Sequence, residues 1–236
     1  LMSFASRTAS RDRLHIFTTN YDRLIEHGFD LIGARPIDRF VGALNPRFRA
    51  SRFDVDIHYS PPGGRGDARP LEGVVRLTKL HGSVDWASVN RQIIRRAMPF
   101  GGPHVFGPHE GDDLLIFPNS AKDIETAFFP YAELFRDFSA AICRPNSALV
   151  TYGYGFGDDH VNRVLRDMLS LPSTHLVVIS YDGAAGRIQR FIQQCGRSAQ
   201  VSVIIGPEIA GLDRLVEHFL PKPAIDTITQ RQAEIL

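Results

Sequence analysis

The sequence predicts an α/β fold built on a doubly wound, mostly parallel sheet. Short apolar runs of strand length alternate along the chain with stretches in which apolar residues recur at three- and four-residue steps. This alternation is typical of parallel strands covered by helices. The run at 175–179, LVVI between polar residues, is nearly continuous in apolar character, as in strands buried on both faces. With 236 residues and 43% hydrophobic residues, the chain can form a Rossmann-like core.

The first element is a strand followed directly by a polar turn. Residues 15–17 (HIF) read as a short buried strand, and residues 18–22 (TTNYD) bring polar side chains to its carboxyl end. Either Asn20 or Asp22 can cap the helix that follows, and Gly28 can end it. Because ligands of open α/β sheets bind outside the carboxyl ends of the strands, this turn is expected to border a crevice.

Two inserts are predicted to be rich in loops. Residues 32–70 carry many Pro, Gly and Arg residues, which favours a long irregular connection with a hairpin around 53–59. Residues 90–113 are punctuated by Gly and Pro in the same way. Between the inserts, residues 74–80 form a plausible strand that ends at His81.

The remaining chain alternates regularly. A strand is expected at 114–117, and Pro130 can occupy the first turn of a helix. A strand at 148–152 leads into a glycine-containing loop, and Asp158 or Asp159 then caps the next helix. The later elements are predicted as a strand at 175–179, a helix around 188–192, a strand at 201–205 and a helix over 212–219.

Charge and cysteine content exclude several classes of function. The chain has 27 basic and 26 acidic side chains and a net charge of +1, so direct nucleic-acid binding and membrane binding are not expected. Cys143 and Cys195 are its only cysteines, too few for a disulfide scaffold or a four-cysteine zinc site. A reduced, cytoplasmic location is expected, because no leader or membrane-length apolar run is visible.

Three strand ends carry polar or glycine-rich residues, at 18–22, 80–83 and 153–162. In a parallel sheet such ends lie along one edge, which predicts that the three converge. Each also has a purely structural interpretation. Asn20 can be a helix cap, His81 can be a satisfied strand-end histidine, and three glycines after a strand can form an ordinary tight turn.

The motifs together resemble a known family. IFTTNYD, TKLHGS and LVTYGYGFGDDHVN, in this order and with IFPNSAKDIETAFFPYAELF between the last two, are similar to the sirtuin-like NAD-hydrolase domains of bacterial antiphage defence proteins. The resemblance implies NAD binding and cleavage of the bond between nicotinamide and ribose.

The resemblance also implies roles for individual residues. Asn20 and His81 match the catalytic asparagine and histidine, and Asp22 matches the acidic residue of the first motif. The residues expected to bind the nucleotide are Thr18, Thr19, Gly153, Tyr154, Gly155, Asp158 and Ser180.

The sequence departs from this family's pattern in two respects. The glycine-rich phosphate loop would lie upstream of Leu1, so we expect the phosphate-loop portion of the fold to be missing here. The zinc module of deacylating sirtuins cannot be built from two cysteines, and no metal is expected. We therefore predict one domain over 1–220, with a tail at 221–236, that hydrolyses NAD.

Other functions stay open from the sequence alone. One is an NAD- or ADP-ribose-binding sensor or assembly module without turnover, and another is a deacylase or ADP-ribosyl transferase. By resemblance, partners would include further copies of this chain, a ring-forming DNA-translocase ATPase or an Argonaute-type protein.

Overall fold

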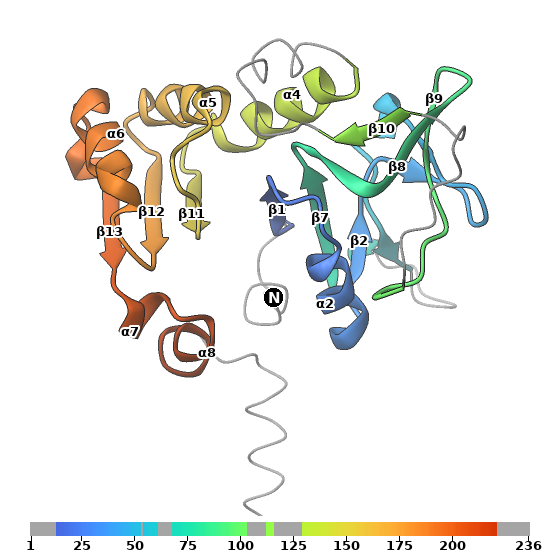
Figure 1. Cartoon of the computed structure of the whole chain (residues 1–236), viewed down its shortest axis with the longest axis horizontal. Coiled ribbons are helices and arrows are strands. Elements are labelled where there is room, and N and C mark those ends of the chain that lie inside the picture. The colour runs from blue at the N-terminus through green and yellow to red at the C-terminus, as the bar shows by residue number, and fades with distance from the viewer. Residues whose placement is uncertain (1–12, 53, 61–67, 103–111, 116–128, 221–236) are drawn as a thin grey trace, which may run out of the picture. The chain divides into compact units, whose positions relative to one another are not determined.

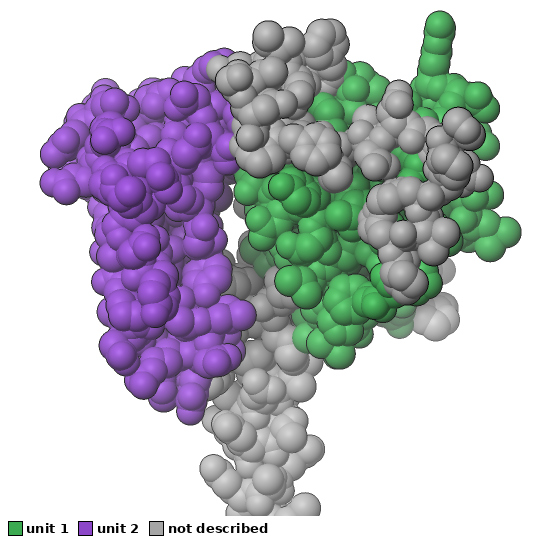
Figure 2. Space-filling view, in the orientation of Figure 1, with its two compact units in different colours: residues 1–119, 128–134, 221–236 green, residues 120–127, 135–220 purple. Residues whose placement is uncertain are grey.

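The computed structural model describes residues 13–52, 54–60, 68–102, 112–115 and 129–220. The α/β, Rossmann-like class predicted from the sequence is confirmed by parallel sheets with associated helices. Two compact units are present, and Figure 2 colours them separately. Unit 1 comprises residues 1–119, 128–134 and 221–236, and unit 2 comprises residues 120–127 and 135–220. The predicted tail at 221–236 and the proposed upstream loop lie outside the described residues.

The parallel sheet of unit 1 has the order β1-β7-β2 (Figure 1). Its strands are β1 (His15–Thr18), β7 (Val74–Lys79) and β2 (Arg35–Ile37). Both neighbouring pairs are parallel. Helix α2 (Leu24–Ile32) follows β1, and its fully buried Phe29 packs with Val75 and Leu77 of β7. This packing holds α2 against the sheet directly behind the TTNYD turn.

The predicted end of this helix at Gly28 is wrong. Helix α2 continues through Gly28 and ends at Ile32, followed by the C-cap residue Gly33 with a left-handed φ of 65°. Burial of Phe29 stabilises the extra turn, whereas Gly28 alone costs only about 1 kcal/mol relative to alanine. Gly33 supplies the left-handed conformation that a helix end requires.

The inserts are more regular than the sequence predicts. Together with β8, which follows His81, segments of both inserts form an antiparallel sheet of order β10-β8-β9-β4-β3, and the first insert also forms a separate pair, β5-β6. The bounds are β3 (Phe40–Val41), β4 (Arg47–Phe48), η1 (Ala50–Arg52), β5 (His58–Tyr59), β6 (Arg69–Pro70), β8 (Gly82–Val89), β9 (Gln92–Arg95) and β10 (Asp112–Leu115). Phe40, Phe48 and Trp86 pack ring against ring within this sheet. This aromatic core explains why a segment rich in Pro and Gly still forms strands.

Unit 2 contains a second parallel sheet in which β12 lies between β11 and β13 (Figure 1). The strands are β11 (Ala148–Tyr152), β12 (His175–Ser180) and β13 (Val201–Ile205), so the predicted strands at 148–152 and 201–205 are confirmed. The other elements are α4 (Tyr131–Ile142), α5 (Asp159–Leu169), η2 (Ala184–Gly186), α6 (Arg187–Cys195), η3 (Ser198–Gln200), α7 (Pro207–Ala210), α8 (Leu212–Arg214) and η4 (Leu215–Phe219). The boundary between the units falls within α4, after Leu134.

The core of unit 2 follows the predicted apolar stripes. Helix α5 buries Val161, Leu165, Met168 and Leu169, and β12 buries Leu176, Val178 and Ile179. The predicted single helix over 212–219 is instead a short α-helical turn, α8, followed by a π-helical turn, η4. In the part of the chain that the structure describes, no helix is long and apolar enough to cross a membrane.

Candidate active site

The TTNYD turn is held by its own side chains. The backbone N–H of Asn20 donates to Thr18 Oγ1 at 3.0 Å, and that of Leu24 donates to Asp22 Oδ1 at 3.0 Å. The N-cap residue of α2 is Arg23 and no side chain caps it, so the predicted cap by Asn20 or Asp22 is wrong. Asp22 instead holds the turn from the residue before the N-cap. The side chain of Asn20 remains at the exposed surface of the turn. An amide that can donate and accept hydrogen bonds is thus carried on a well-held turn.

The second predicted motif lies directly against this turn. The N–H of Leu80 donates to the Thr18 carbonyl at 2.8 Å, and the N–H of Val84 donates to the Tyr21 carbonyl at 3.0 Å. The hydroxyl of Ser83 also donates to the Tyr21 carbonyl, at 3.3 Å. Because β1 and β7 are parallel neighbours, the prediction that these two strand ends converge is confirmed.

His81 occupies the junction between β7 and β8. Its side chain is 3% exposed, and the residue after it, Gly82, has a φ of 84°. This positive φ suits glycine and turns the chain from the parallel strand β7 into the antiparallel strand β8. His81 is therefore fixed by strands on both sides and lies next to the segment that carries Asn20.

Lys79 connects the end of β7 to the TTNYD turn and to the start of α2. It is the last residue of β7 and 3% exposed. Its ammonium donates to the backbone carbonyl of Asp22 and forms a 3.0 Å ion pair with Glu26 Oε1 in the first turn of α2. The role of Lys79 is not visible in the sequence, because its burial and its partners appear only in the fold.

In unit 2, the loop after β11 is held by a buried asparagine. Asn162 of α5 donates from Nδ2 to the Phe156 carbonyl at 3.1 Å. The Tyr154 hydroxyl lies 2.9 Å from Asn162 Oδ1 and 3.1 Å from the Asp158 carbonyl oxygen, two acceptors for its one proton. Burial raises the pKa of Tyr154 well above its ordinary value of 10.0, and the nearby charge of Asp158 adds to the effect. Tyr154 is thus a neutral structural group in this loop.

The backbone of this loop needs glycine at its first position. Gly153 has a φ of 64°, with its N–H bonded to the Ile179 carbonyl at 3.1 Å. At Gly155, an added Cβ would lie 3.2 Å from a terminal nitrogen of Arg187. The Nε of Arg187 donates to the Gly155 carbonyl at 2.6 Å. An exposed guanidinium at the first position of α6 is therefore anchored to the glycine loop with further donors to offer.

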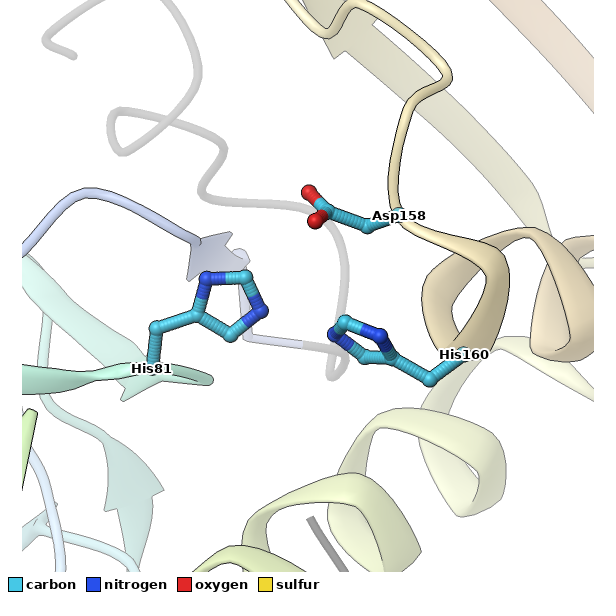
Figure 3. A group of neighbouring side chains, drawn as sticks. All are labelled: His81, Asp158 and His160. Carbon is cyan, nitrogen blue, oxygen red and sulfur yellow. The ribbon is translucent and has the colours of Figure 1, made fainter. Parts of the chain in front are cut away.

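The start of α5 carries an acid and an imidazole. Asp158 occupies the N-cap position, yet its side chain makes no capping hydrogen bond, so the predicted side-chain cap is wrong for this residue. The backbone carbonyl of Asp158 instead accepts the Asn162 N–H at 2.9 Å. A carboxylate oxygen of Asp158 and a ring nitrogen of His160 lie within 4.8 Å of each other. Figure 3 draws both side chains at the start of α5, together with His81 of unit 1.

The acidic residues at the start of α5 make this helix N-terminus unfavourable for binding an anion. Asp158 and Asp159 place negative charge where a helix N-terminus would otherwise attract an anion. His160 is buried and packs edge-to-face on Phe135, with ring centroids 4.9 Å apart. A carboxylate at this position is suited to accept hydrogen bonds from ribose hydroxyls, and Arg187 is the better candidate for a phosphate contact.

The remaining predicted binding residues lie at strand ends. Thr18 uses its hydroxyl to hold the Asn20 N–H, and Thr19 follows it half-buried. Ser180 is buried at the end of β12, where its carbonyl accepts the Gly206 N–H at 3.1 Å. Gly153, Tyr154, Gly155, Asp158 and Ser180 all belong to unit 2, and their joining the unit 1 residues around one ligand stays a prediction.

Three functional candidates were missed by sequence reasoning: Lys79, Asn162 and Arg187. Asn162 lies within the GYGFGDDHVN motif. Its hydrogen bond to the Tyr154 hydroxyl joins residues eight positions apart, a spacing that no sequence pattern predicts. Arg187 is the first residue of α6, the helix after β12. A basic residue at the start of that helix is the only sequence feature that could have indicated it. No sequence feature indicates Lys79, since a lysine in a strand normally faces solvent.

Comparison with protein families identifies a SIR2-like domain over residues 14–199, well over half of the chain. Proteins with this domain are in general NAD-dependent enzymes, so the match indicates NAD-related chemistry. The matched range includes the TTNYD turn, the LHGS strand end and the glycine loop. No curated protein gives a significant match to the chain.

Proposed function

Because this chain belongs to the SIR2-like domain family, we propose that it is an NAD glycohydrolase that releases nicotinamide and ADP-ribose. The observation that carries the proposal is the direct bonding of the TTNYD turn to the LHGS strand end, which brings an amide and an imidazole to neighbouring strand ends. An imidazole can accept a proton from the attacking water, and an amide can orient that water, so the pair suits hydrolysis of a glycosidic bond.

In the proposed reaction, the bond between the ribose anomeric carbon and the nicotinamide nitrogen breaks, and its electron pair leaves with neutral nicotinamide. Water then forms a new bond to the anomeric carbon and gives up one proton. His81 accepts this proton, a contribution typically worth ~10²- to 10⁴-fold in rate. Asn20 orients the attacking water or a ribose hydroxyl, which lowers the entropic cost of the step. Asp22 keeps the turn in place through the Leu24 N–H.

The residues of unit 2 are proposed to bind the adenosine diphosphate part of NAD. Arg187, anchored on the Gly155 carbonyl, offers a guanidinium to the diphosphate. Asp158 accepts from ribose hydroxyls, and Ser180 contacts the adenosine. Gly153 and Tyr154 give the loop its shape.

The lack of a four-cysteine zinc module favours hydrolysis over deacylation, since the chain has 2 cysteines. The test is nicotinamide release from NAD by the purified chain, with and without an acylated peptide. Release without any acceptor supports the hydrolase, and release only with an acceptor supports a deacylase or transferase. Binding of NAD without any nicotinamide release in the presence of the physiological partner would select the sensor or assembly module.

The biological setting is also part of the proposal. We propose a cytoplasmic antiphage effector that depletes NAD when activated and acts as a homo-oligomer. A ring-forming DNA-translocase ATPase or an Argonaute-type protein would be the activating partner. NAD levels in cells that carry the gene, measured before and after phage infection, test this setting.

A further inference from the structure

A lysine of unit 1 is buried next to the turn that carries Asn20. Lys79 is 3% exposed, and its partner Glu26 is 24% exposed at the side chain. The second carboxylate oxygen of Glu26 is buried without a hydrogen-bond partner among the described residues. A buried ion pair with an unsatisfied oxygen contributes little net stability, and apolar side chains of similar size are often as good. Fold stability alone therefore does not account for the pair.

The geometry of the pair points to another role. The Lys79 ammonium donates to the carbonyl of Asp22, two residues after Asn20, and Lys79 itself stands two residues before His81. Glu26 holds the ammonium from the first turn of α2. One side chain thus links the end of β7, the TTNYD turn and the start of α2.

We propose that Lys79 is a positioning residue that fixes Asn20 relative to His81, with Glu26 holding its ammonium in place. This role rests on the proposed NAD hydrolysis. The hydrogen bond from Lys79 opposes outward movement of the turn at Asp22, and the bonds from Leu80 and Val84 fix the adjoining backbone. A displacement of the order of 1 Å between catalytic groups costs about 100-fold in rate.

The test compares Lys79→Met with a matched control on the same strand, Arg76→Met. Arg76 also donates to a backbone carbonyl, that of Val55 at 3.0 Å, but on the insert side and away from the turn. We expect Lys79→Met to lower kcat for nicotinamide release by about 10- to 100-fold, with KM for NAD changed less than about threefold. Arg76→Met should leave kcat within about threefold.

Two further readouts separate positioning from general destabilisation. Hydrogen–deuterium exchange of a peptide spanning residues 18–26 should become faster in Lys79→Met and stay unchanged in Arg76→Met. Glu26→Gln keeps an oxygen that can accept from the ammonium but removes the charge that pairs with it, so its kcat should lie between those of the wild type and Lys79→Met. If Lys79→Met does not fold, Lys79→Gln provides the same comparison.

The outcomes distinguish this proposal from the proposed function. An inactive wild-type chain would count against hydrolysis, while the exchange of residues 18–26 would still test the role of Lys79. Unchanged exchange in the Lys79 variant, or equal losses of kcat in the Lys79 and Arg76 variants, would overturn the positioning role even if the wild type releases nicotinamide.

Discussion

Asn162 should stabilise unit 2 through two hydrogen bonds that can be measured separately. Its Nδ2 donates to the Phe156 carbonyl at 3.1 Å, and its Oδ1 accepts from the Tyr154 hydroxyl at 2.9 Å. Each bond contributes ~1 kcal/mol, and a buried carbonyl left without its donor adds a further cost. We therefore expect Asn162→Ala to lower the free energy of unfolding by about 2–3 kcal/mol.

The matched variant is Tyr154→Phe, which removes the hydroxyl and leaves the bond from Asn162 to Phe156 in place. It should cost about 1 kcal/mol. Because the two residues share one hydrogen bond, the double variant should lose about 1 kcal/mol less than the sum of the single variants. Urea denaturation followed by far-UV circular dichroism gives the three values.

A strictly additive double variant would show that the two side chains do not interact. An Asn162→Ala protein as stable as the wild type would refute the whole network, and with it the account of how the glycine loop is held. The only tryptophan, Trp86, lies in unit 1. Its fluorescence therefore reports separately on the unit that the substitution does not touch.

Three further predictions concern the same unit. Since the pKa of Tyr154 is raised, unfolded protein loses this proton first as pH rises past about 10, so the stability that Tyr154 contributes is present below that pH. This contribution should decrease by about 1.4 kcal/mol per pH unit above it. Urea denaturation should therefore show the wild type more stable than Tyr154→Phe at pH 8, and this advantage should be lost or reversed at pH 11. Gly153→Ala should cost about 1–2 kcal/mol of unfolding free energy because φ is 64°, whereas Gly157→Ala, where an added Cβ meets nothing within 4 Å, should cost little. Arg187→Ala should raise KM for NAD about 10-fold or more through a lost phosphate contact, while the exposed Arg190→Ala on the same helix should not.

Each of these predictions has a clear contrary result. Parallel pH profiles for the wild type and the Tyr154 variant would mean that the hydroxyl titrates normally. Equal losses at the two glycines would remove the argument from backbone conformation. An unchanged KM for NAD in the Arg187 variant would mean that this guanidinium only holds the glycine loop and does not contact the phosphates of NAD.

The regular parts of the chain could be predicted from the sequence because local pattern and tertiary packing agree there. The strand β11 and the strand β13 have the predicted bounds, since apolar runs of strand length are bounded by turn residues. Helix α2 was predicted too short, because the burial of Phe29 against β7 outweighs the weak helix propensity of Gly28. Its true end depends on a contact that is remote in sequence.

The candidate site was predictable to the extent that its chemistry stands in local motifs. Asn20 and His81 were assigned from TTNYD and LHGS, and the pairing of β1 with β7 brings these segments together. Lys79 and Asn162 act through partners far along the chain or on another turn, so no pattern in the sequence indicates them. The aromatic core likewise joins Phe40 and Phe48 of the first insert to Trp86 of β8. Because these residues are far apart in sequence, no local pattern predicts the antiparallel sheet.

The most direct test of the central claim is nicotinamide release from NAD by the wild-type chain, by Asn20→Ala and by His81→Ala. Matched controls are Asn45→Ala and His58→Ala, which alter exposed residues of the inserts. We predict release of nicotinamide and ADP-ribose in equal amounts by the wild type and both controls. We also predict at least ~100-fold slower release by the two site variants, both of which should still unfold cooperatively and so be folded at the assay temperature. Full activity in Asn20→Ala and His81→Ala would contradict the account.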